Sequence, residues 1–124
     1  MTAPNIINVN AIYGKTVAVS ATTATVTLVD NPVNSGKVLK INTLYVANMN
    51  GTASADISVI LYTDSTLVPL VPKYLARTVT VPADTTVLVL GRDGPIYLEE
   101  GCRISILGSI AGYLDAICSY EDIS

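Results

Sequence analysis

The sequence predicts an all-β protein, a single antiparallel β-sandwich of about eight strands with no substantial helix. The chain is rich in Val, Ile and Thr, whose branched Cβ atoms suit a pleated sheet better than a helix. Residues that favour turns recur at short intervals, and apolar and polar positions alternate in the segments between them. A jelly roll and an immunoglobulin-like sandwich both fit this pattern.

Turns divide the chain into short strands. They are expected at residues 20–23, 30–36, 48–52, 64–72, 82–84, 91–95, 99–101 and 108–112. The segment 91–95, Gly-Arg-Asp-Gly-Pro, lacks the following Lys and the helix of a phosphate-binding loop, so we interpret it as a hairpin turn. No window of the chain has the apolar spacing that an amphipathic helix requires.

The run of residues 37–48 changes its alternation midway. Leu39 and Ile41 share one parity, whereas Leu44 and Val46 share the other. A bulge or bend near Asn42-Thr43 accounts for the change, and we expect it to let one strand serve two sheets.

Length and composition indicate one domain that works in an assembly. A chain of 124 residues is long enough for one hydrophobic core. Half of its residues are hydrophobic, only 14% are charged, and the mean hydropathy is +0.50, so we expect apolar surface to be buried against partner subunits. The net charge of −3 and the scattered basic residues argue against nucleic-acid binding.

The termini and the longest turn suggest two contact segments. Residues 1–10 form an uncharged, β-prone N-terminal arm ahead of the sandwich domain, residues 11–124. The arm suits strand addition to a neighbour's sheet edge, and a first strand packed on its own sandwich is an equal alternative. The apolar turn 64–72 either covers the core or makes a contact. The N-terminus has no secretory signal and no segment is long enough to span a bilayer, which predicts synthesis in the host cytoplasm and no membrane.

The two cysteines are predicted to face each other. If residues 108–112 form a hairpin turn, symmetric pairing places Cys102 opposite Cys118 and Ile104 opposite Ala116 on one apolar face. A disulfide directly across neighbouring strands is strained, so two buried, reduced thiols are the default.

Catalytic chemistry is not indicated. The chain contains no histidine, which removes the commonest general base and metal ligand. Adjacent residues on a strand point to opposite faces, so the pairs Glu99-Glu100 and Glu121-Asp122 are not expected to act together. Asp93, with Glu99 and Glu100, lacks the alternating ligands of a calcium loop. We therefore expect no catalytic, cofactor-binding or metal-binding residue.

Several segments carry a resemblance to a known family. They are residues 41–48 (INTLYVAN), 50–53 (NGTA), 56–59 (DISV), 75–85 (LARTVTVPADT), 96–101 (IYLEEG), 111–116 (AGYLDA) and 119–124 (SYEDIS). Together they resemble small virion proteins of tailed bacteriophages, including those that infect cyanobacteria, over roughly the whole chain. The resemblance implies a β-sandwich on the phage particle and marks no site residue. The Pro-containing segment 64–72 and the two cysteines depart from typical members.

The resulting functional hypothesis is a non-enzymatic virion protein. The leading form is a capsid decoration or cement protein that binds between major capsid proteins as a symmetric oligomer, with a trimer favoured. A neck, tail or fibre-associated module is the alternative within the structural class. A receptor- or carbohydrate-binding module is the alternative from another class, although the tyrosines do not cluster in the predicted loops.

Overall fold

The computed structural model describes residues 11–63, 71–91 and 93–124, which form nine strands and no helix. The strands are β1 (Ile12–Ser20), β2 (Val26–Asp30), β3 (Val38–Asn48), β4 (Ala55–Tyr62), β5 (Pro72–Val81), β6 (Thr86–Leu90), β7 (Ile96–Leu98), β8 (Arg103–Gly108) and β9 (Leu114–Ile123). The all-β prediction is confirmed. No helix in the described ranges is long and apolar enough to cross a membrane. The predicted arm, residues 1–10, and most of the turn 64–72 lie outside the described residues.

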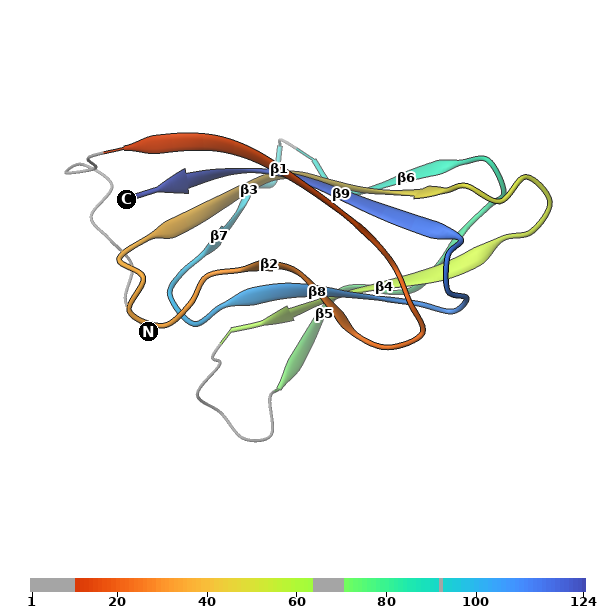
Figure 1. Cartoon of the computed structure of the whole chain (residues 1–124), viewed down its shortest axis with the longest axis horizontal. Helices are drawn as coiled ribbons and strands as arrows, with labels where there is room; N and C mark the ends of the chain where they lie inside the picture. Colours follow the sequence, from red (N-terminus) through yellow and green to blue (C-terminus); the bar gives the residue numbers. More distant parts are fainter. Residues whose placement is uncertain (1–10, 64–70, 92) are drawn as a thin grey trace.

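Two antiparallel sheets pack face to face (Figure 1). The five-stranded sheet has the order β1-β9-β3-β6, and β7 pairs with β3 beside β6. The four-stranded sheet has the order β2-β8-β4-β5. The first strand therefore pairs with the last, the second with the next to last, and β4 with β5 at the centre of the chain. This is a long hairpin rolled up on itself, the topology of a jelly roll.

β6 and β7 together take the place of one strand of the jelly roll, and the interruption between them is the reason that the fold has nine strands. Both strands are antiparallel to β3 and follow one another along the same edge of it. The segment 91–95 therefore does not reverse the chain, and its interpretation as a hairpin turn was wrong. A Gly-and-Pro segment breaks the pairing with β3 without turning the strand back.

The bulge in β3 was predicted correctly, but not its consequence. The register of β3 with β9 shifts between Ile41 and Thr43, so Leu39, Ile41, Leu44 and Val46 all face the core. However, β3 pairs only with strands of the five-stranded sheet. The bulge keeps the apolar side chains on both sides of it directed toward the core. It does not carry β3 into the second sheet.

The predicted pairing of the two cysteine-containing strands was wrong. β8 pairs with β2 and β4, whereas β9 pairs with β1 and β3 in the other sheet. The turn between them crosses from one sheet to the other, with the Ala21 amide donating to Leu114 O at 2.8 Å and the Gly108 amide to Thr22 O at 2.8 Å. The inward residues of both strands still share one core, because the two sheets face each other across it.

Two buried asparagines fix the turns at opposite ends of the sandwich. The Asn31 side-chain amide donates to Lys37 O at 3.0 Å and to Leu98 O at 2.9 Å. Asn48 donates in the same way to Ala53 O and Val81 O, both at 3.0 Å. A short polar side chain in a turn can satisfy buried backbone carbonyls that no strand reaches. Sequence analysis placed both residues in turns but did not identify them as buried anchors.

Candidate interaction surfaces

In the acidic pair Glu99-Glu100, the Glu100 side chain stabilises the fold. The Glu100 carboxylate accepts hydrogen bonds from the amides of Asn34, at 3.2 Å, and Gly36, at 3.0 Å. Both of these residues have positive φ angles, 63° and 71°, so their amides converge on one acceptor. Glu100 therefore holds the β2–β3 turn in its left-handed conformation.

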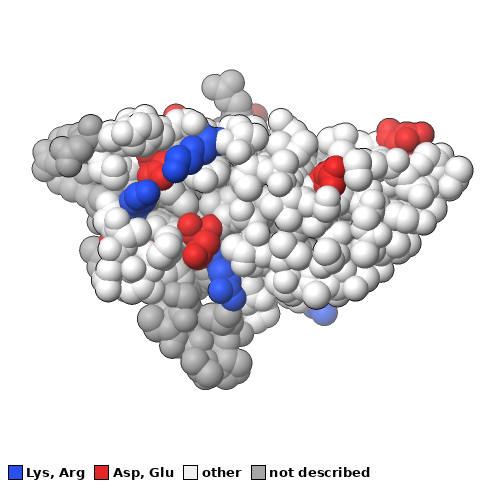
Figure 2. Space-filling model, viewed as in Figure 1, with Lys and Arg blue, Asp and Glu red and all other residues white. Residues whose placement is uncertain are grey.

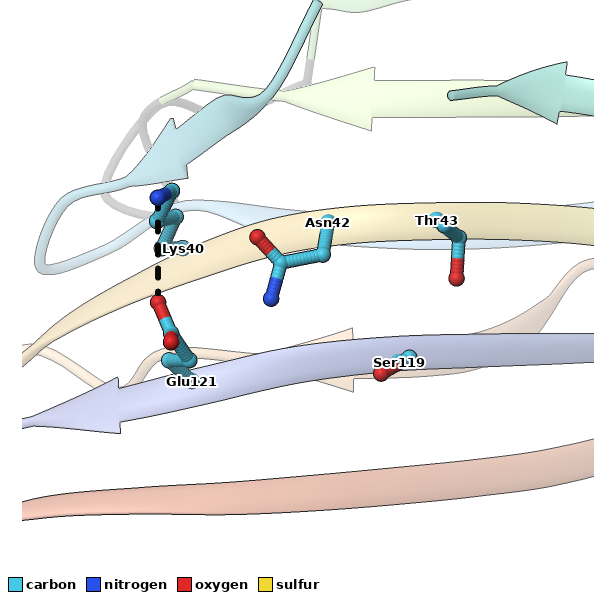
Figure 3. Close-up of a pocket in the computed structure, with 5 residues that line it drawn as sticks. All are labelled: Lys40, Asn42, Thr43, Ser119 and Glu121. Carbon is cyan, nitrogen blue, oxygen red and sulfur yellow. Dashed lines mark ion pairs between the residues drawn. The ribbon is translucent and has the colours of Figure 1, made fainter. Parts of the chain in front are cut away.

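The second acidic pair points to opposite faces of β9, as predicted. Glu121 lies on the outer face of the five-stranded sheet, where its carboxylate is 3.8 Å from Lys40 Nζ (Figure 3). Asp122 points inward, and its Oδ2 accepts hydrogen bonds from Lys15 at 3.0 Å and Lys37 at 3.2 Å. The two carboxylates therefore cannot act on one substrate.

Asp122 is the most deeply buried charged residue in the described part of the chain. Its side chain is only 5% exposed, whereas Lys15 and Lys37 keep 46% and 42% of their side chains accessible. Burial opposes ionisation and is the largest single effect on this carboxyl. The hydrogen bonds and charges of the two lysines together outweigh it, so the pKa of Asp122 lies below its ordinary value. In turn, the hydrogen bond to Asp122 and then its charge raise the pKa of Lys15.

No metal site is formed by the residues that the structure describes. Nowhere among them do three or more Cys, Asp or Glu side chains come together in a way that could hold an ion. Asp93, Glu99 and Glu100 do not form a calcium site. The described part of the chain thus offers binding surfaces but no assembled ligand cage.

Both cysteines are buried thiols. Cys102 Sγ donates to Thr63 O at 3.3 Å, and Cys118 is fully enclosed in the core. Burial raises the pKa of Cys118 to about 12, which keeps this thiol protonated and unreactive at neutral pH. The structure therefore holds both cysteines in the reduced form that the sequence indicated.

The outer face of the five-stranded sheet has a polar part and an apolar part. Near the β3 bulge it forms a shallow hollow, with the Lys40–Glu121 ion pair at one end (Figure 3). The hollow is lined by Lys40, Asn42, Thr43, Ser119 and Glu121. Farther along, one row of paired positions runs across β1, β9, β3 and β6, formed by Ala18, Ile117, Tyr45 and Leu88. Leu88 is 61% exposed at the end of this row, so apolar surface reaches the solvent there.

Charges are unevenly distributed on the molecule. In Figure 2 they gather over the half where β1 begins and β9 ends, and the other half of this face shows few of them. Lys15 near the start of β1 and Asp122 near the end of β9 form a cluster with Lys37, and its charges are already neutralised in part by ion pairs. A nearly uncharged surface favours contacts with proteins over contacts with phosphates.

The exposed tyrosines do not form a platform. Tyr13 on β1 and Tyr97 on β7 are 60% and 48% exposed, but β9 and β3 lie between their strands. The Tyr74 ring lies 5.0 Å from the Arg77 guanidinium, and the Tyr62 ring lies 4.9 Å from that of Arg103. Stacking on a sugar or a base would need rings that converge on one place.

The most exposed edge of the sandwich is β1. Its residues are exposed from Ile12 to Thr16, and Val17 and Val19 are only half-buried. Ile12 and Tyr13 are 55% and 60% exposed, so this edge strand presents apolar side chains beside its outward backbone N–H and C=O groups. Sequence analysis did not identify this strand as a contact surface, because alternation of residues does not reveal which strands lie at an edge.

Comparisons with known proteins show a likeness of fold alone. No protein-family model and no curated protein matches it. A chain from infectious bursal disease virus, Gx strain, aligns over 91% of this chain with a TM-score of 0.51 and 12% identity. T=1 particles derived from infectious bursal virus give a TM-score of 0.50, also at 12% identity over 91% of the chain. The alignments cover 32% and 31% of those viral chains, so this chain spans about a third of each.

A bacterial appendage shows a weaker likeness. A chain from Bacillus endospore appendages, described as disulfide-linked pili, aligns over 98% of this chain and 95% of its own length. Its TM-score is 0.46 and its identity 13%, which is too distant to support an argument. The comparisons agree with an all-β sandwich and do not define a family.

Proposed function

We propose that this chain is a non-enzymatic structural protein of a phage virion, a capsid decoration or cement protein that binds between major capsid proteins. The observation that carries the proposal is the jelly-roll sandwich with an open edge strand that exposes apolar side chains, in a chain of which only 14% of residues are charged. Such surfaces bury well against other proteins. The likeness of the fold to about a third of two viral chains supports the general part of the proposal, a structural and non-enzymatic role.

The N-terminal arm supplies a second contact in this proposal. The described chain begins at Ala11, whose backbone exchanges hydrogen bonds of 3.2 and 3.0 Å with Ser124. The arm, residues 1–10, therefore joins the sandwich where β1 and the C-terminal end of β9 lie together. We expect a chain without residues 1–10 to remain folded by circular dichroism and to bind particles more weakly. Unchanged binding by the truncated chain would contradict the role of the arm.

The direct test of the virion role is quantitative mass spectrometry of purified particles. A copy number equal to that of the major capsid protein, or a simple fraction of it, is expected for a decoration or cement protein. A handful of copies would instead indicate a neck, tail or fibre-associated module. Absence of the chain from particles would overturn the proposal and leave a binding module as the alternative.

A further inference from the structure

Among the described strands, β1 pairs only with β9, so every second residue of β1 directs its backbone hydrogen-bonding groups away from the sheet. Ala11 and Ser124 exchange both of their backbone hydrogen bonds, and the register of β1 with β9 then runs without a shift from Ile12 to Ser20. In an antiparallel pair, such exchanges recur at every second residue. The odd-numbered residues of β1 therefore bond to β9, and Gly14, Thr16 and Ala18 direct their N–H and C=O groups toward the free edge.

The other described edges are protected against strand addition. β2 has five residues and a register shift, and the opposite edge of its sheet, β5, begins with Pro72 and carries Lys73 and Arg77. β6 and β7 are short and separated by the segment 91–95. Short strands, bulges, prolines and outward charges are the usual means of preventing edge-to-edge pairing. β1 has nine residues, a regular register and no proline.

We propose that β1 pairs with β1 of a second copy of this chain, antiparallel, about a twofold axis at Thr16. Thr16 then lies opposite itself, Gly14 opposite Ala18, and Ile12 opposite Ser20. All of these are even-numbered residues, so each pair exchanges the backbone groups that point outward from the two edges. The two five-stranded sheets merge into one continuous sheet across the dimer.

The side chains of β1 are self-complementary in this register. Tyr13 lies opposite Val19 and Lys15 opposite Val17, which gives an aromatic and β-branched pair and brings no like charges directly together. Lys15, the one cation of the strand, already binds Asp122 at 3.0 Å within its own subunit. The even-numbered positions from Gly14 to Ser20 are small, so no bulky side chain hinders the approach.

The contact does not depend on the virion role, and it concerns the isolated chain. It predicts a twofold dimer in place of the trimer that the sequence favoured. Because the axis passes through Thr16, a charge at this position meets its own copy. Thr16→Lys and Thr16→Glu should therefore each weaken the dimer about tenfold, whereas their equimolar mixture should form a mixed dimer of about wild-type strength.

The experiment is sedimentation equilibrium of the full chain, the two variants and their mixture. Thr27→Lys is the matched control, because it places the same charge at an exposed position of the edge strand β2, and it should dimerise as the wild type does. Circular dichroism confirms that each variant is folded. A monomeric wild type, a trimer indifferent to Thr16→Lys, or a mixture no stronger than its components would overturn the pairing. None of these results would change the copy number on particles, so the virion role is tested separately.

Discussion

The two long edge strands of the sandwich, β1 and β5, differ in nearly everything that controls strand pairing. They have nine and ten residues, and both are largely exposed. β1 follows β9 without a register shift, and its one charged side chain bends back to Asp122. β5 begins with a proline, carries Lys73 and Arg77, and shifts register twice against β4. Length and exposure therefore do not decide whether an edge can accept a partner.

The difference shows where an assembly contact can form. An edge strand offers a template for pairing unless irregularity or charge disrupts it. In β5 Thr78 has a φ of 47°, an uncommon conformation for a β-branched residue, so the outward row of backbone groups is interrupted. β1 keeps that row intact. We infer that the five-stranded sheet can be extended at β1, whereas the four-stranded sheet cannot accept a further strand at β5.

The strongest effect is expected from proline substitutions at neighbouring residues of β1. Val17→Pro removes an amide that donates to β9 and should lower the free energy of unfolding by about 3 kcal/mol. Thr16→Pro removes an outward amide and should leave the monomer within about 1 kcal/mol of wild type, while abolishing self-association. Urea denaturation and sedimentation measure the two effects. Equal destabilisation by both prolines would contradict the assigned alternation.

A smaller effect is expected from Asp122→Asn, which removes the carboxylate that binds Lys15 and Lys37. The variant should lose about 2 kcal/mol of stability, because a nearly buried acceptor of two charged donors is replaced by an amide. Its Lys15 would lose the carboxylate that neutralises it on the β1 edge, so dimerisation should weaken as well. Lys40→Ala, which breaks an exposed pair with Glu121, is the control and should change stability little.

The same carboxylate predicts how stability depends on pH. The folded pKa of Asp122 lies below its ordinary value of 3.8, so its stabilising contribution is complete above that value. The contribution is lost as the pH falls through the lower folded pKa. Urea denaturation of the wild type across this acidic range should therefore show a loss of stability that Asp122→Asn does not share. Parallel curves for the two proteins would contradict the assignment.

The smallest effect is expected from Thr78→Gly on β5. Glycine adopts positive φ without steric cost, and Thr78 is exposed, so the variant should gain about 1 kcal/mol. The change leaves Pro72, Lys73 and Arg77 in place, so β5 should remain closed to partners. Thermal denaturation and sedimentation test both statements. New association through β5 in this variant would show that the strained residue alone protects that edge.

From the sequence we could predict which side chains face the core more accurately than which strands pair with one another. Alternation placed Cys102 and Cys118 on buried faces and located the bulge in β3, because burial follows from a period of two. It could not predict that β8 and β9 lie in different sheets, since a short turn serves a hairpin and a crossing between sheets equally well. Gly91 and Pro95 raised the same ambiguity, because such residues interrupt a strand as readily as they reverse it.

The candidate surface was harder to predict than the core. Glu121 and Asp122 were expected to point apart, and they do, but the two lysines that converge on Asp122 come from β1 and the segment before β3. The open edge of β1 depends on the order of the described strands, in which β9 alone pairs with it. Long-range pairing of this kind is not contained in local patterns.

The most direct test of the account is residue-resolved amide hydrogen exchange along β1, measured by NMR at low and at high protein concentration. We predict that Val17 and Val19, which bond to β9, are protected at both concentrations. The amides of Gly14, Thr16 and Ala18 should exchange freely in the dilute sample and become protected in the concentrated one, while β5 shows no such change. Free exchange of Gly14, Thr16 and Ala18 at high concentration would contradict the claim that β1 is the assembly edge of this protein.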